Sequence, residues 1–87
     1  MSQMRELKAR AQLLKPVLHL GHDGLTDALV AALDQSLHDH ELVKMRFGDF
    51  KDQRKQLSRE LATRTGATLV LQVGHTATFH RAPTAET

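Results

Sequence analysis

The chain of 87 residues contains no cysteine, tryptophan or tyrosine, and it has only three phenylalanines and two prolines. Without cysteine, neither a disulfide framework nor a thiolate metal site can stabilise the fold. No apolar run approaches the roughly 18–20 residues of a membrane-spanning helix, and the N-terminal segment lacks a secretory pattern. We therefore expect a soluble, cytoplasmic protein without a membrane partner, and the length indicates one small domain.

Charge is unevenly distributed along the chain, although the net charge is only +2. Residues 1–20 hold four basic side chains against one acidic, and residues 42–66 hold seven against three. Residues 21–41 hold five acidic side chains and no lysine or arginine. This segregation favours a basic face, but charge alone is equally compatible with an ordinary solvated surface.

Hydrophobic spacing predicts seven elements in the order helix, strand, helix, strand, helix, strand, strand. We expect an α+β fold in which three helices cover a four-stranded mixed sheet. One domain is expected over residues 1–81, followed by a short flexible tail at 82–87. The predicted helices cover 3–14, 27–38 and 50–64, and the predicted strands cover 17–20, 42–47, 68–73 and 76–81.

Local signals refine these elements. Thr26 is expected to cap the second helix and Asp49 the third, because their side chains can accept from free helix amides. Alternation is expected to point Leu69, Leu71 and Val73 towards the core, together with Ala77 and Phe79. A tight turn at residues 74–75 is expected to join the last two strands.

The segment 20–26 ends an apolar run, brackets two polar residues with Gly21 and Gly24, and opens a helix. Such a turn would expose backbone amides and the positive end of the helix dipole, which suits a phosphate. The alternative interpretation is a strand-to-helix turn that needs glycine only for its dihedral angles.

Six short motifs follow one another along the chain. They are Leu14-Lys15-Pro16-Val17, Leu20-Gly21-x-x-Gly24-Leu25-Thr26, His40-Glu41-Leu42-Val43-Lys44, Thr65-Gly66-Ala67, Val73-Gly74-x-Thr76 and Arg81. Together they closely resemble the CRM domain (chloroplast RNA splicing and ribosome maturation) in its free-standing bacterial form, the YhbY-like proteins. The resemblance covers about residues 4–81.

The resemblance implies a non-enzymatic RNA-binding domain, similar to the C-terminal domain of translation initiation factor three and to KH domains in its GxxG loop. Bacterial members are associated with precursors of the large ribosomal subunit. The implied function is therefore assistance in 50S assembly, as a monomer that binds ribosomal RNA and also contacts ribosomal proteins. No cofactor is implied.

Under this resemblance, the loop residues Gly21, His22, Asp23 and Gly24 would clamp the RNA backbone, because glycine lets the main chain approach phosphates. Lysine is frequent in the family at positions 22 and 75, and tyrosine at position 80, where this chain has histidine. A neutral imidazole contacts phosphate more weakly than lysine does. The other candidate RNA contacts are Lys15, Lys44, Arg46, Arg5, Lys8, Arg10, His75 and Arg81.

Other chemistries find less support in the sequence. Base stacking is expected to be limited, since the only three aromatic side chains are phenylalanines and two of them belong to the predicted core. His38 and His40 lack a third ligand for zinc, and the adjacent His22 and Asp23 lack a nucleophile motif. No metal site and no catalysis are therefore expected.

A second function from another class remains open. The acidic second helix and the residues that follow it could dock on a ribosomal or assembly protein. The residues that suggest such a protein-interaction module are Asp34, Asp39 and Glu41.

Overall fold

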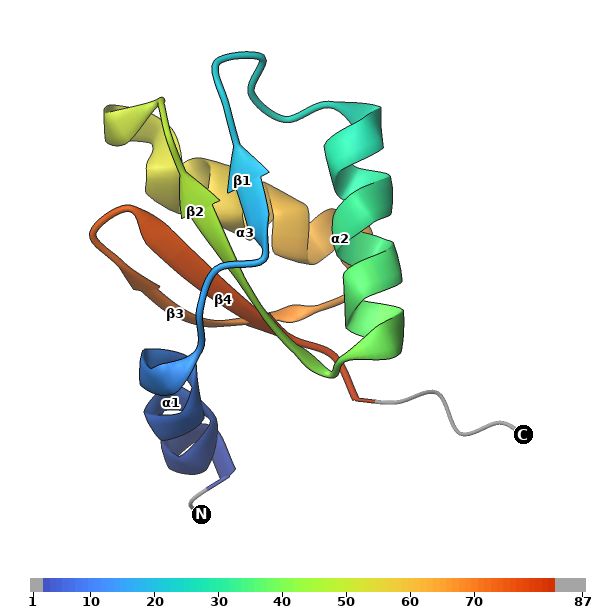
Figure 1. Cartoon of the computed structure of the whole chain (residues 1–87), viewed down its shortest axis with the longest axis vertical. Helices are drawn as coiled ribbons and strands as arrows, with labels where there is room; N and C mark the ends of the chain where they lie inside the picture. Colours follow the sequence, from blue (N-terminus) through green and yellow to red (C-terminus); the bar gives the residue numbers. More distant parts are fainter. Residues whose placement is uncertain (1–2, 83–87) are drawn as a thin grey trace.

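The computed structural model describes residues 3–82, in which helices cover both faces of a four-stranded mixed sheet (Figure 1). This architecture confirms the predicted α+β fold and element order; of the predicted tail, residues 83–87 lie outside the described part. The elements are α1 (Gln3–Leu13), β1 (Leu18–Leu20), α2 (Asp27–Asp39), β2 (Leu42–Phe47), the 3-10 turn η1 (Lys51–Gln53), α3 (Arg54–Thr65), β3 (Thr68–Val73) and β4 (Thr76–His80).

The strands lie in the order β1-β2-β4-β3, with β1 parallel to β2 and the other pairs antiparallel. A parallel pair needs a crossover, and α2 provides it. The carboxyl ends of β1 and β2 therefore lie at the same end of the sheet as the β3–β4 turn, since Arg46 pairs with Thr76. We call this end of the sheet, with residues 21–24, 48–50 and 74–75, the loop end. The opposite end, where β4 reaches Arg81, is the Arg81 end.

Two hydrophobic clusters hold the layers together. The larger lies between the sheet and the helices α2 and α3, where Leu33, Leu61 and Phe79 are fully buried. The smaller lies on the other face of the sheet, where α1 packs Leu7 and Ala11 on β2 and β3. Because α1 sits away from the loop end (Figure 1), it leaves the other half of this face uncovered.

The strand β3 departs from the strict alternation expected from its sequence. Leu69 pairs with Phe79, but the next pair is Leu71 with Thr78, so Val70 is an extra residue in a bulge. Val70 and Leu71 therefore both pack against the α1 cluster. The predicted alternation is confirmed for Leu69, Ala77 and Phe79, which pack in the larger cluster. Leu71 packs instead on the smaller cluster on the other face, and the prediction is wrong for Val73, which is 59% exposed.

The start of the third helix also differs from the prediction. The carboxylate of Asp49 accepts from the amide of Phe50 at 2.8 Å instead of capping a helix. Phe50 is in the left-handed region (φ 59°), η1 follows it, and α3 begins at Arg54 without a side-chain cap. By contrast, Thr26 caps α2 as predicted, since its hydroxyl accepts from the amide of Leu29 at 3.1 Å.

Candidate nucleic-acid interface

The glycine-bracketed loop 21–24 leads from the end of the edge strand β1 towards α2, at the top of Figure 1. The amide of Gly24 donates to the carbonyl of Gly21 at 3.0 Å, which closes a four-residue turn. Within the described chain, the amides of His22 and Asp23 have no hydrogen-bond partner. The loop thus presents two free backbone donors near the first turn of α2, an arrangement that suits an anion.

The ring of Phe50 lies against Gly24 of this loop. A side chain at Gly24 would place its Cβ 3.3 Å from Cζ of the Phe50 ring, and Gly24 itself has a φ of 74°. Both observations favour glycine at this position, because positive φ disfavours other residues and the ring leaves little space. This contact was not predictable from the local sequence, which places Phe50 at the start of the helix expected over residues 50–64.

Acidic groups at the loop oppose its backbone donors. His22 and Asp23 approach to 3.4 Å, and both side chains are more than three quarters exposed. Asp27 lies in the first turn of α2, where its carboxylate favours the helix dipole but repels an anion. The loop is therefore better suited to main-chain contact with a phosphate than to attraction by side-chain charge.

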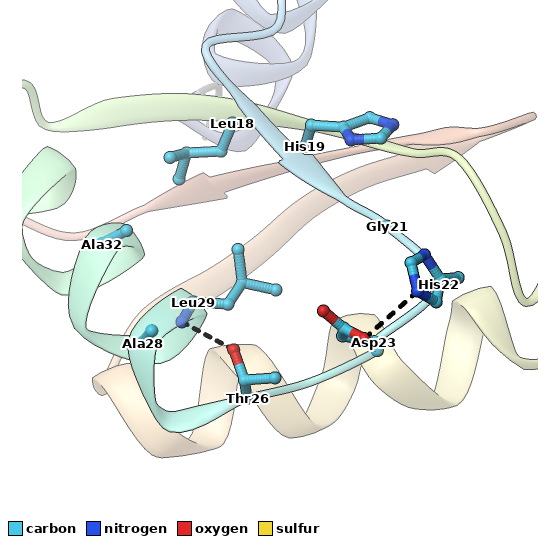
Figure 2. A pocket seen from close by; sticks show the side chains of 10 residues that line it. Leu18, His19, Gly21, His22, Asp23, Thr26, Ala28, Leu29 and Ala32 are labelled. Carbon is cyan, nitrogen blue, oxygen red and sulfur yellow. Dashed lines mark hydrogen bonds and ion pairs between the residues drawn. The ribbon is translucent and has the colours of Figure 1, made fainter.

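A shallow groove of about 420 Å³ runs between the loop, β1 and the first turns of α2 (Figure 2). Leu18 and Leu29 provide apolar walls, and α2 contributes the small side chains of Ala28 and Ala32. The groove is therefore open at the loop, polar at one end and apolar at the other. This combination suits a ligand with a charged backbone and flat apolar groups.

Two predicted contacts, Lys44 and Arg46, lie on one face of β2, and a third, Lys15, lies in the connection between α1 and β1. Arg46 is exposed at the loop end, and within residues 3–82 no carboxylate lies within ion-pairing distance of it. Lys44 is half-buried, and its ammonium donates to the carbonyl of Leu14 at 3.1 Å, which ties β2 to the end of α1. Lys15 borders the same hollow as Lys44, further from the loop.

The remaining basic candidates are divided between the two ends. His75 is exposed in the hairpin turn at the loop end, where its carbonyl accepts from the amide of Phe47 at 2.7 Å. Arg5, Lys8 and Arg10 are exposed on α1, which lies at the other extreme of the long axis of the molecule (Figure 1). The fold therefore does not bring the first-helix bases to the loop.

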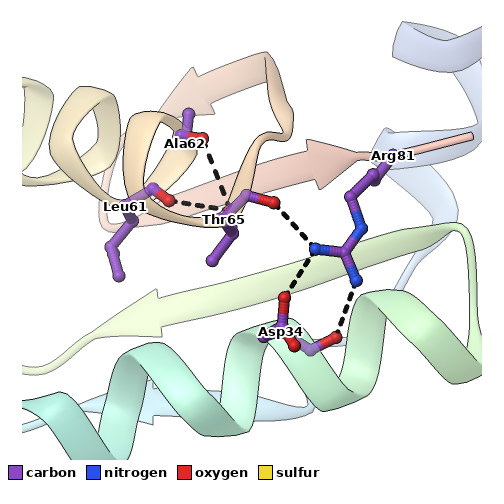
Figure 3. A network of polar contacts seen from close by, with 5 residues as sticks. All are labelled: Asp34, Leu61, Ala62, Thr65 and Arg81. Atoms are coloured by element: carbon purple, nitrogen blue, oxygen red, sulfur yellow. Dashed lines mark hydrogen bonds and ion pairs between the residues drawn. The ribbon is translucent and has the colours of Figure 1, made fainter.

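Arg81 has an intramolecular role that its sequence position did not reveal (Figure 3). One guanidinium nitrogen donates to the carboxylate of Asp34 and to the carbonyl of Thr65, both at 2.7 Å. The other donates to the carbonyl of Asp34 at 3.0 Å. The side chain joins β4, α2 and α3, which leaves few donors for an RNA phosphate.

The acidic residues that suggested a protein-docking helix also have partners. Asp34 binds Arg81, Asp39 accepts from the side-chain Nε2 of Gln35 at 3.2 Å, and Glu41 lies 3.1 Å from the imidazole of His80. These contacts partly satisfy the carboxylates that a docking partner would have to bind.

Two further findings concern the described residues alone. No helix within them combines the length and apolar character that crossing a membrane requires. Nor do three histidine, aspartate or glutamate side chains in this part of the chain lie close enough together to hold a metal ion.

A mixed sheet with a glycine-bracketed loop after its edge strand defines the protein as a small α+β domain with one specialised end. The chain belongs to the CRS1 / YhbY (CRM) domain family, whose model matches residues 1–81. This confirms the resemblance that the ordered motifs indicate.

Individual relatives agree with this assignment. Two bacterial proteins are each 35% identical over 80 residues, or 91% of this chain: "Probable RNA-binding protein PA4753" of Pseudomonas aeruginosa and "RNA-binding protein" of Haemophilus influenzae. The matches cover 77% and 81% of these relatives. The solution structure of SAV1595 from Staphylococcus aureus superposes with a TM-score of 0.82 at 25% identity, covering 99% of this chain and 91% of that one.

Proposed function

We propose that this protein is a non-enzymatic RNA-binding protein that engages ribosomal RNA of the assembling large subunit, in the cytoplasm and as a monomer. The observation that carries the proposal is the loop 21–24, whose free amides and glycines allow the main chain to approach phosphates. Family membership and the RNA-binding names of two relatives support RNA as the ligand. The partnered acidic residues of α2 give no comparable support for protein docking.

Recognition would begin at the loop end. The amides of His22 and Asp23 would contact one phosphate, and Arg46 would contact a neighbouring one along the β1–β2 face. Contacts of this kind depend on phosphate charge, so affinity should fall steeply as ionic strength rises. A flat salt response would instead indicate a protein partner.

The replacement Gly21→Asp tests the loop. The new Cβ would meet only the His19 ring at 3.8 Å or more, and the φ of Gly21 is not positive, so the fold should tolerate it. The added carboxylate should repel phosphate and lower RNA affinity by at least about 10-fold. The matched control is Gln12→Glu, which adds the same charge on an exposed site of α1. Equal affinity of the two variants would exclude the loop as the binding site.

In-cell RNA crosslinking combined with gradient sedimentation tests the ribosomal part of the proposal. We expect large-subunit ribosomal RNA to be enriched in the crosslinked fraction and the protein to sediment with precursor particles. Enrichment of other RNAs would retain RNA binding but overturn the role in subunit assembly.

A further inference from the structure

His19 is an exposed aromatic side chain beside the loop, and the function proposed above does not use it. Its neighbours Leu18 and Leu20 pack with the core on one side of β1, so alternation turns His19 to the other side. Figure 2 shows the imidazole on the side of β1 that faces away from α2. His19 pairs in register with Arg46 of β2, which places an imidazole and a guanidinium on adjacent strands.

The imidazole of His19 packs against Gly48. A Cβ at Gly48 would collide with Nε2 of His19, so the ring lies directly against the glycine backbone. The amide of Gly48 donates to the carbonyl of Leu20 at 2.8 Å, which fixes the end of β2 beside β1. The ring is therefore seated on a bare stretch of backbone, although its outer surface remains exposed.

A hollow of about 410 Å³ lies on this side of β1. Pro16 and Val17 line its apolar part, His19 and Arg46 line its polar part, and Leu18 of β1 also borders it. Val17 is 65% exposed, and Arg46 has no ion-pairing carboxylate within residues 3–82. An apolar wall, an imidazole and a guanidinium without an ion pair in this range match the face, edge and adjoining phosphate of a nucleotide.

We propose that this hollow binds one unpaired base of the RNA, with the imidazole of His19 and the guanidinium of Arg46 as its stacking and contacting groups. The inference rests on the proposed RNA-binding function and adds its substrate class: single-stranded RNA, or a loop or bulge, in preference to a continuous duplex. Bases inside an A-form helix are stacked on each other and cannot enter a side pocket.

The position of the hollow relative to the loop supports this assignment. The groove is lined by residues of α2, which packs on the core face of the sheet. The hollow is lined by His19 and Arg46, which alternate with core residues and face the other way, so the two lie on opposite sides of β1. An RNA strand held at the loop can therefore cross β1 and place one nucleotide on each side. Because β1 is the edge strand of the sheet that residues 3–82 form, no strand in this part of the chain blocks this path.

The test compares binding of a fluorescent single-stranded oligoribonucleotide of about eight nucleotides with binding of a blunt duplex of the same length. We expect the wild type to prefer the single strand. His19→Ala should weaken single-strand binding about 5- to 20-fold and change duplex binding little, because one stacking contact is lost. His38→Ala, which removes an exposed imidazole from the last turn of α2, is the matched control.

Two further variants test the site in other ways. Arg46→Lys tests whether the planar guanidinium is needed in addition to its charge, and Gly48→Ala tests whether the position of the His19 ring matters when the ring is still present. Arg46→Lys keeps the charge, so the salt dependence should persist while single-strand affinity falls. Gly48→Ala should displace the His19 ring and lower single-strand affinity as much as His19→Ala does. The double variant His19→Ala/Gly48→Ala should bind the single strand as tightly as either single variant. Circular dichroism and thermal unfolding show whether each variant remains folded.

The outcomes distinguish the two proposals. If wild-type protein binds neither RNA, or Gly21→Asp binds as the wild type does, the proposed loop function fails. If Gly21→Asp abolishes binding while His19→Ala, Arg46→Lys and Gly48→Ala bind single strands like the wild type, only the base site is overturned. A wild type that prefers duplex also overturns the base site.

Discussion

The two ends of the sheet differ in whether their polar groups have partners within the protein. At the Arg81 end, one guanidinium has three acceptors at 2.7–3.0 Å, and His80 and Glu41 form a close pair. At the loop end, the amides of His22 and Asp23 have no hydrogen-bond partner within residues 3–82, and none of the carboxylates in this range forms an ion pair with Arg46. The same sheet therefore carries a satisfied polar network at one end and available donors at the other.

This difference indicates how stability and binding are divided in the molecule. Polar groups that are paired within the protein stabilise it and have little left for a ligand. Groups without partners contribute little to folding but can bind an incoming phosphate or base. We therefore expect substitutions at the Arg81 end to act on unfolding, and substitutions at the loop end to act on RNA affinity.

The largest expected effect is the loss of the Arg81 network. Arg81→Ala removes three hydrogen bonds between β4, α2 and α3, which should lower the free energy of unfolding by about 2–3 kcal/mol. Urea denaturation measures this change, with Arg81→Lys as a control that keeps the charge but not the planar fork. RNA affinity, measured well below the unfolding temperature, should change less than about twofold. A large loss of affinity with unchanged stability would return Arg81 to the binding face.

Gly24→Ala should lower both the stability of the fold and the affinity for RNA. The methyl group would press on the Phe50 ring at 3.3 Å and require a φ of 74°, which should cost about 1–2 kcal/mol of stability. The same strain should disturb the loop and weaken RNA binding. Thermal unfolding and a binding titration measure the two effects; unchanged values for both would show that the loop is more adaptable than this geometry implies.

Asp23→Asn should strengthen the loop end as a binding site. It removes an exposed carboxylate beside the two free amides while keeping the shape of the side chain. RNA affinity at low salt should rise about 2- to 5-fold, and the gain should shrink as salt screens the charge. The control is Asp52→Asn in η1, and equal gains from both variants would indicate a general effect of net charge.

The smallest effect is expected from the first helix. The double replacement Lys8→Gln with Arg10→Gln removes two exposed charges at the far extreme of the molecule from the loop. Affinity for a short single-stranded RNA should fall less than about twofold, because screening limits charge effects beyond roughly 10 Å. A steep loss would show that the RNA interface extends along the whole long axis.

Local features of the fold were predictable where neighbouring residues decide them. Thr26 caps α2 and the turn at Gly74 joins β3 to β4, as their sequence contexts indicate. The bulge at Val70 was not predictable, because it depends on how β3 aligns with β4. The start of α3 was missed for a similar reason, since the left-handed Phe50 is used to place a ring under Gly24.

By itself, the sequence determined the element order, the loop 21–24 and the family, because each is written in adjacent residues or in ordered motifs. Only the tertiary structure decided which charges are available. It placed Arg81 against Asp34 and Thr65, and it set Arg46 beside His19 without an ion-pair partner among residues 3–82. The physical reason is that a charge is satisfied by whatever the fold brings within a few ångströms, and those partners lie up to 47 positions away along the chain.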